Sequence, residues 1–379
     1  MEFGFRKEHH LLKQMLEEFT ENEVRPLAQE IDEQERFPVE AVSKMKEAGI
    51  LGIPFPTKYG GEGGDYMGYI IAVKEISKAC ATTGVVLSAH GSLCAQPIYD
   101  YGTEEQKQKY LVPLASGEKL GAFALTEPNA GTDASKQETI AVKDGDNYII
   151  NGSKIFITNA GYADIYVIFA MTDKKQGTRG ITAFILEKGM KGFSVGPKEK
   201  KMGIRGSSTC ELIFDNVIVP KENVLGKEGY GFKIAMKTLD GGRIGIAAQA
   251  CGIAEGALDE TIKYVKERKQ FNRPLARFQN TQFVIADLAT KIDAAKMLLY
   301  RAAYKKDNKE NISKEAAMAK LFASEVAMEV TNKAIQLHGG YGYSREYPVE
   351  RMMRDAKITE IYEGTSEVQK MVISASVLR

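Results

Sequence analysis

Residues 165–186 read I-Y-V-I-F-A-M-T-D-K-K-Q-G-T-R-G-I-T-A-F-I-L, and this stretch indicates the architecture of the middle of the chain. Two short runs rich in β-branched and aromatic residues flank a polar segment that ends in glycine. Such runs, separated by turn residues, predict antiparallel strands. Similar runs recur between about residues 119 and 225, among them Y-I-I-N-G and C-E-L-I-F, with D-G-D and K-G-M-K-G as turns. We therefore expect a small antiparallel β domain over residues 119–225.

Both flanks of this domain show helical periodicity. Near the start of the chain the apolar residues with helical spacing are Leu11, Leu12, Met15, Leu16 and Phe19. After Gly229 one apolar stripe, with intervals of three and four residues, consists of Ile285, Leu288, Ile292, Ala295, Leu299 and Ala302. We expect a multidomain α+β fold, with an N-terminal helical domain over 1–118 and a C-terminal helical bundle domain over 226–379.

Length and charge limit the classes of function. At 379 residues the chain is too long for one compact core and is long enough to enclose a large ligand. A formal net charge of +1 gives no electrostatic sign of nucleic acid or an anionic membrane as main partner. The four cysteines show no C-x-x-C spacing, and no apolar segment is long enough for membrane insertion. These features predict a soluble, cytoplasmic protein with buried thiols.

Two stretches near the β segment could meet a ligand. In A-L-T-E-P-N-A-G-T-D, residues 124–133, turn chemistry is one interpretation, and donors from Thr126, Gly131 and Thr132 facing a polar ligand are the other. In K-I-F-I-T-N-A, residues 154–160, the two-residue period of a strand places Phe156 and Thr158 on one face. An aromatic ring beside a hydroxyl would suit a flat heteroaromatic group, and core packing is the equal alternative.

Three further stretches lie in the C-terminal half. L-D-G-G-R, residues 239–243, is expected to open a helix, with Asp240 as a possible N-cap and Arg243 as a possible surface charge. The cation-rich E-R-K-Q-F-N-R-P-L-A-R-F-Q, residues 267–279, is either a solvated loop or a pyrophosphate-binding loop. Q-L-H-G-G-Y-G-Y, residues 336–343, ends a helix and has extra glycines that would permit close approach of a ligand; His338 is expected to pack rather than catalyse.

The last stretch, I-T-E-I-Y-E-G-T-S-E-V-Q, covers residues 358–369. Glu363 stands between a tyrosine and a glycine, in the break between two helical patterns. It could be a solvated loop residue or a positioned base. The local sequence does not decide between them.

In their order and spacing these stretches resemble the acyl-CoA dehydrogenase family from end to end, especially its short-chain, butyryl-CoA branch. K-K-M-G-I-R-G-S and R-D-A-K-I-T-E-I-Y-E-G-T-S-E add to the resemblance. It implies an N-terminal helical domain, a middle antiparallel β domain and a C-terminal four-helix bundle. It also implies a homotetramer, a dimer of dimers, with one non-covalent FAD in each subunit.

The same resemblance implies roles for individual residues. Thr126 and Thr158 would hydrogen-bond the flavin of their own subunit, and Phe156, where many relatives carry tryptophan, would pack on its ring. Thr365, Ser366 and Glu367 would complete that site. The residues expected to reach the FAD of a neighbouring subunit are Arg268, Phe271, Gln279, Gln336, Gly339 and Gly340. Thr132 is expected to serve both cofactor and substrate.

For the substrate, the resemblance implies that Asp240, Arg243, Tyr362 and Gly364 join Thr132 along the path of the CoA thioester. Glu363 would be the base that removes the α-proton while a hydride leaves the β-carbon for flavin N5. Some branches of the family supply the base from the position of Gly242, and glycine there leaves Glu363 as the candidate.

The expected activity is oxidation of butyryl-CoA to crotonyl-CoA, or the reverse reduction, with electrons exchanged with electron-transferring flavoprotein. Other short or branched acyl groups stay open, as do the physiological direction and electron bifurcation. An acyl-CoA oxidase and a non-catalytic or nucleic-acid-binding relative are the weaker alternatives.

Overall fold

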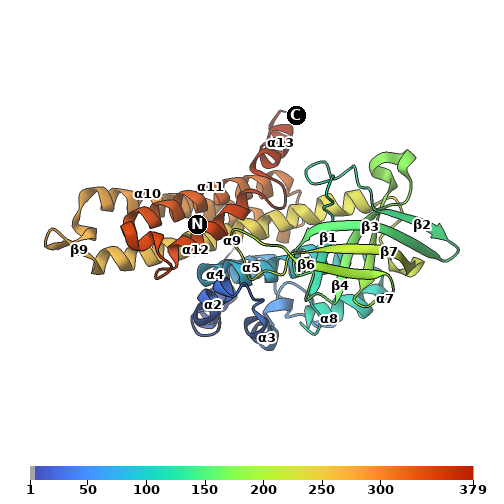
Figure 1. The fold of residues 1–379 in the computed structure, drawn as a ribbon, viewed down its shortest axis with the longest axis horizontal. Helices are drawn as coiled ribbons and strands as arrows, with labels where there is room; N and C mark the ends of the chain where they lie inside the picture. The colour runs from blue at the N-terminus through green and yellow to red at the C-terminus, as the bar shows by residue number, and fades with distance from the viewer. Residues whose placement is uncertain (1–4, 379) are drawn as a thin grey trace.

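The computed structural model describes residues 5–378, and Figure 1 shows an elongated molecule with a β-sheet at one end and long helices at the other. The first part of the chain is helical, as predicted. Its α-helices are α1 (Lys7–Phe19), α2 (Ala28–Glu33), α3 (Val39–Glu47), α4 (Tyr66–Ala79), α5 (Ala81–Ser88), α6 (Gln96–Tyr101), α7 (Glu104–Gln106) and α8 (Val112–Ala115). A π-helical segment, Ala89–Ala95, joins α5 to α6.

The middle part forms one sheet. Its strands are β1 (Gly121–Ala124), β2 (Ile140–Asp144), β3 (Asn147–Ile157), β4 (Ile165–Met171), β5 (Ile181–Glu187), β6 (Phe193–Lys198), β7 (Cys210–Pro220) and β8 (Val224–Leu225). They run in the order β6-β7-β3-β2-β4-β5-β8, and β1 pairs with β4. The stretch 165–186 forms β4 and β5, antiparallel from Ile165 opposite Glu187 to Met171 opposite Ile181. The sheet is mainly antiparallel, but β4 pairs in parallel with β1 and with one residue of β2.

The predicted alternation at Phe156 and Thr158 is wrong. Strand β3 ends at Ile157, so Thr158 lies in the turn that follows. The pairing of β3 with β7 shifts register between Lys154 and Ile157, and Phe156 has a φ of 57°. A bulge adds a residue to one strand and breaks the two-residue period. As a result Lys154 is fully buried while Phe156 is 59% exposed.

The last part is helical again. It contains α9 (Gly231–Glu267), α10 (Gln279–Asp307), α11 (Ser313–His338), α12 (Val349–Lys357) and α13 (Ser366–Val377). Between α9 and α10 a short hairpin pairs β9 (Lys269–Gln270) with β10 (Arg273–Pro274). The stripe predicted for α10 is confirmed, since all of its members are buried except the partly buried Ile285. Gly339 caps α11 with a φ of 62°.

The prediction that L-D-G-G-R opens a helix is wrong, because α9 begins at Gly231. Asp240 is therefore no N-cap, and Arg243 is buried rather than a surface charge. Two adjacent glycines in a helix cost about 1 kcal/mol each relative to alanine, which is why the pattern indicated a boundary. Close packing explains their presence: a Cβ on Gly242 would lie 2.7 Å from Leu93.

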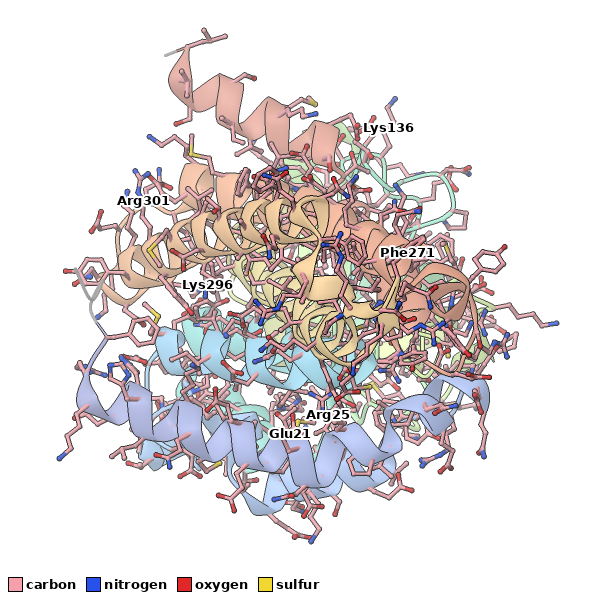
Figure 2. The ribbon with its side chains drawn as sticks, turned by 90° about the vertical axis from the view of Figure 1, so that its left-hand side faces the viewer. Glu21, Arg25, Lys136, Phe271, Lys296 and Arg301 are labelled. Atoms are coloured by element: carbon pink, nitrogen blue, oxygen red, sulfur yellow. The ribbon has the colours of Figure 1, made fainter. Side chains whose placement is uncertain are left out.

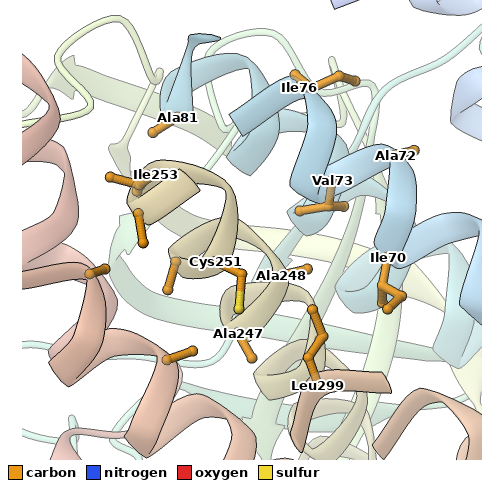
Figure 3. Close-up of a cluster of buried hydrophobic side chains, with 14 of the residues drawn as sticks. Ile70, Ala72, Val73, Ile76, Ala81, Ala247, Ala248, Cys251, Ile253 and Leu299 are labelled. Atoms are coloured by element: carbon orange, nitrogen blue, oxygen red, sulfur yellow. The ribbon is translucent and has the colours of Figure 1, made fainter. Parts of the chain in front are cut away.

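The main core lies where α4 and α5 cross α9 and α10 (Figure 3). Its apolar members include Ile70, Val73, Ile76, Ala247, Ala248, Cys251 and Leu299. All four cysteines are buried and free. Among the described residues no helix is both long and apolar enough to cross a membrane. The core holds the N-terminal helices against α9, and this fixes the neighbourhood of Gly242.

Candidate active site

Glu363 sits in a short loop with unusual backbone geometry. The loop lies between a helical turn, Ile358–Glu360, and α13, which Thr365 caps by accepting a hydrogen bond from the Val368 N–H. Glu363 has a φ of 55° and Gly364 a φ of 95°. A non-glycine residue in the left-handed region is uncommon, and such residues cluster at functional sites. The loop therefore holds Glu363 in a conformation that its neighbours must stabilise.

The Glu363 carboxylate has no hydrogen-bond or ionic partner among residues 5–378. Its Oε2 atom is buried, and no hydrogen bond or ion pair reaches the carboxylate from any residue in the described range. Burial raises the pKa of Glu363 to about 8, against the opposing charges of Lys320 and Arg243. Desolvation favours the neutral acid, so the ionised form is a stronger base than a solvated carboxylate.

Helix α9 makes room for this carboxylate. A Cβ built on Gly242 would lie only 2.0 Å from Glu363 Oε2. At Gly245, one turn further along α9, a Cβ would lie 3.0 Å from the Tyr69 hydroxyl. Tyr66 donates a hydrogen bond of 2.6 Å to the Gly241 carbonyl. The carboxylate thus lies against a glycine face of α9, between the loop and the buried helix α4.

Two cations bind the main chain of the Glu363 loop. Lys320 Nζ donates to the Gly364 carbonyl at 2.8 Å, and Arg243 Nε donates to the Glu363 carbonyl at 3.4 Å. Gln369 Nε2 also donates to the Gly364 carbonyl, at 2.8 Å. Arg243 in turn forms an ion pair of 2.9 Å with Asp240. The structure therefore brings together Asp240, Arg243, Glu363 and Gly364 of the predicted set.

Tyr362 belongs to the same cluster. Its hydroxyl donates a hydrogen bond to Gln249 Oε1 on α9. Burial, followed by the charge of Glu363, raises the pKa of Tyr362 well above its usual value. Ser313, at the start of α11, donates to Asp240 Oδ2 at 2.5 Å. Thr132, by contrast, is exposed in the loop between β1 and β2, and no hydrogen bond joins it to these residues in the described range.

The predicted flavin residues of the β domain lie beside one another. The Thr126 carbonyl accepts a hydrogen bond of 2.9 Å from the Ile155 N–H, directly before Phe156. Thr126 and Thr158 are partly exposed, and their hydroxyls take part in no hydrogen bond with the described residues. An exposed ring with two available hydroxyls fits a flat, polar-edged group such as a flavin. Ser366, at the start of α13, has a buried hydroxyl with no hydrogen-bond partner among the described residues.

A buried ion pair fixes this loop. Lys154 Nζ contacts Glu127 Oε1 at 2.6 Å and donates to the Leu125 carbonyl and Gln137 Oε1, each at 3.1 Å. Glu127 also accepts from the backbone N–H of Thr139. Although burial opposes it, the Lys154 ammonium lowers the pKa of Glu127. The pair therefore ties the loop that carries Thr126 to strand β3.

The residues expected to reach the FAD of a neighbouring subunit gather at the other end of the molecule (Figure 1). Arg268 caps α9 and lies over the Tyr341 ring at 5.4 Å, next to Gly339 and Gly340. Figure 2 views the molecule from this end, where Phe271 is 88% exposed in the hairpin. Gln279 begins α10, and Gln336 is exposed on the last turn of α11. Within one chain these residues are remote from Phe156.

Sequence reasoning missed Lys154, Glu127 and Lys320. Lysine is almost never fully buried unless paired, so its occurrence in a strand or a helix predicts a solvent-facing side chain. A useful signal was the apolar setting of Lys320 in A-A-M-A-K-L-F-A, residues 316–323. His338 packs, as expected: it is buried and stacks on Tyr264 at 4.2 Å. In the part of the chain that the structure describes, no acidic, histidine or cysteine cluster could hold a metal ion.

Comparison with known proteins gives matches along the whole chain. Three family models match: Acyl-CoA dehydrogenase, N-terminal domain, over residues 6–118; the middle domain over 122–217; and the C-terminal domain over 229–378. The acyl-CoA dehydrogenase, short-chain specific, of Clostridium acetobutylicum is 64% identical over 379 residues and covers 100% of both chains.

Two solved structures share the fold over their full length. Butyryl-CoA dehydrogenase from Megasphaera elsdenii is 55% identical, with a TM-score of 0.98 and 100% of both chains covered. A chain from the structure reported as electron transferring flavoprotein of Acidaminococcus fermentans, in connection with flavin-based electron bifurcation, is 59% identical. It has a TM-score of 0.99, again with 100% of both chains covered.

Proposed function

This chain belongs to the acyl-CoA dehydrogenase family, FAD-dependent oxidoreductases of CH–CH bonds, and we propose that its substrates are short-chain acyl-CoA thioesters. Butyryl-CoA would be oxidised to crotonyl-CoA, or formed from it by the reverse reduction. The full-length similarity to a short-chain specific dehydrogenase and to a butyryl-CoA dehydrogenase supports this substrate class.

The observation that carries the proposal is the buried, unpartnered carboxylate of Glu363. A thioester α-proton is weakly acidic, so its removal needs a strong and well-positioned base. Burial strengthens the base, and Gly242 leaves the space in which the carboxylate lies. Glu363 would take the α-proton from the substrate face opposite the flavin.

The loop also offers a donor for the thioester oxygen. The Glu363 N–H makes no hydrogen bond within the described residues, and a free N–H can stabilise the enolate charge that develops during proton removal. Bound FAD would supply the acceptor for the hydride from the β-carbon. Thr126, Phe156 and Thr158 would hold its ring system, with Thr365, Ser366 and Glu367 near it.

We extend the proposal to partners and assembly. Electrons would be exchanged with electron-transferring flavoprotein. The similarity to a chain from the structure reported as electron transferring flavoprotein of Acidaminococcus fermentans supports this partner. The residues at the hairpin end are remote from Phe156 in one chain, so they would serve the FAD of another copy in a dimer of dimers. The 88% exposure of Phe271 supports a role at such a contact.

An anaerobic absorbance titration tests the proposal. Wild-type protein and Glu363→Gln would be compared as butyryl-CoA is added. We expect flavin absorbance in both proteins and rapid bleaching in the wild type only. A yellow wild type that is not reduced would contradict the acyl group, and equal reduction of both proteins would contradict the role of Glu363.

A further inference from the structure

Lys320 is fully buried with no carboxylate of the described residues in direct contact, which is unusual for an ammonium group. Its side chain, on α11, has no solvent exposure. Its Nζ atom makes a single hydrogen bond, to the Gly364 carbonyl at 2.8 Å, and no carboxylate of the described chain lies within ion-pair distance. A buried charge normally requires a direct ionic partner. The placement of Lys320 therefore calls for an explanation other than packing.

The charged groups around Lys320 all lie near the Glu363 loop. Glu363 exerts the strongest attraction on it, Arg243 repels it, and Glu360 and Glu367 add weaker attractions. Around Glu363 the cations are Lys320 from α11 and Arg243 from α9. Tyr66 and Tyr69 of α4 and Tyr362 of the loop are the neutral titratable neighbours.

Both cations bind loop carbonyls and leave the carboxylate free. Lys320 donates to the residue after Glu363, and Arg243 donates to the Glu363 carbonyl. A direct ion pair would occupy the lone pairs of the base and weaken it. A positive charge that is close to a buried acid but not bonded to it still lowers the free energy needed to ionise that acid. It also satisfies the carbonyl of a residue with positive φ.

We propose, on the basis of the function proposed above, that Lys320 is a positioning residue for the base: it fixes the Glu363 loop through the Gly364 carbonyl and favours ionisation of the Glu363 carboxylate without bonding to it. Lys320 acts through Glu363 and needs no contact with substrate or flavin. Burial lowers the pKa of Lys320 to about 8, against the attraction of Glu363, so each group stabilises the charge of the other.

The test measures the protonation of Glu363 directly. Infrared difference spectra of the resting holoenzyme, with Glu363→Gln as the reference, would report the carboxylic acid band as a function of pH. The variants are Lys320→Gln, which keeps a hydrogen-bond donor, and Lys320→Met, which removes it. Lys333→Met is the matched control, because Lys333 lies on the same helix and is exposed. Flavin content and thermal unfolding would establish that each variant is folded.

Loss of the positive charge raises the pKa of Glu363, so we expect the midpoint in Lys320→Gln to move upward by about 1 pH unit. At pH 7, reduction of the flavin by butyryl-CoA should become about tenfold slower and recover at higher pH. Lys320→Met should show the same shift and a further loss that alkaline pH does not restore. Lys333→Met should leave the midpoint unchanged.

Two results separate this inference from the proposed function. If the midpoint in folded Lys320→Gln stays at the wild-type value while butyryl-CoA reduces the wild type, the inference is wrong and the proposed function stands. If the midpoint moves but butyryl-CoA does not reduce the wild type, the role of Lys320 in ionising Glu363 stands and the substrate class is wrong.

Discussion

Two buried lysines, Lys154 in the β domain and Lys320 in the helical bundle, differ in how they interact with a nearby glutamate. Lys154 contacts Glu127 directly at 2.6 Å, and the pKa of Glu127 is lowered by that charge although burial opposes it. Among the described residues the Lys320 ammonium hydrogen-bonds only the Gly364 carbonyl, next to Glu363, and burial raises the pKa of Glu363 to about 8. Direct pairing gives an inert acid that holds a loop. Indirect pairing leaves a basic carboxylate.

Breaking the direct pair should have the largest effect on stability. In Lys154→Met the Glu127 carboxylate loses its counter-charge, and removal of one partner of a buried pair costs about 3–5 kcal/mol. We expect a fall of this size in the free energy of unfolding, measured by urea denaturation. FAD should also dissociate more readily, because Lys154 fixes the loop of Thr126.

Lys143→Met is the control for this change, since Lys143 is exposed on the neighbouring strand β2 and should alter stability by less than about 0.5 kcal/mol. The double variant Lys154→Met with Glu127→Gln should recover part of the loss, because no charge is left unpaired. Simple additivity of the two single changes would contradict a direct interaction.

Removing the acid of the indirect pair should stabilise the protein. Burial raises the pKa of Glu363 from 4.5 to about 8, so the folded state binds its proton more tightly than the unfolded state. The cost of ionisation is absent below pH 4.5, grows as pH rises, and is complete above about pH 8. We expect Glu363→Gln to be more stable than wild type by about 1–3 kcal/mol at pH 8 and equal to it near pH 4.

Thermal unfolding across this range checks the expectation. A difference between Glu363→Gln and wild type that is constant with pH would mean that ionisation of Glu363 carries no cost. It would also remove the contrast between the two lysine sites.

The smallest expected effect concerns the space that Gly242 leaves for the Glu363 carboxylate. In Gly242→Ala the new methyl group would occupy the position 2.0 Å from Glu363 Oε2. Because the flexible carboxylate can move aside, the fold should persist while flavin reduction slows by about tenfold, or about 1.4 kcal/mol. Gly241→Ala is the matched control, since its methyl group would meet Lys306 and Tyr66 instead. Equal rates in both variants would contradict a steric role for Gly242.

The patterns that the sequence predicted correctly are those in which one physical rule acts alone. The stripe of α10 and the paired strands β4 and β5 follow from burial of apolar residues at a fixed period. The continuation of α9 through Asp240 and Gly242 was missed because intrinsic propensity opposes it and tertiary packing outweighs propensity. Residues 118 and 225 remain predicted boundaries; nearby, α8 ends at Ala115 and α9 begins at Gly231.

The motifs indicated the family, and the structure brings Asp240, Arg243 and Tyr362 close to Glu363. The roles of these residues remain predictions. The apolar neighbours of Lys320 in the sequence were a sign of its burial, but the partners of Lys154 and Lys320 could not be found from sequence, because Glu127 and Gly364 are distant in the chain. Apolar neighbours can indicate that a charged side chain is buried, but they do not show whether it faces a carboxylate or a carbonyl.

The missing Cβ of Gly242 also constrains how this site could change over generations. A side chain at position 242 of helix α9 would compete with the Glu363 carboxylate for the same space. A larger residue at position 242 therefore requires the Glu363 side chain to move. Positions 242 and 363 are therefore coupled, and we expect a change at one of them to alter which residues are tolerated at the other.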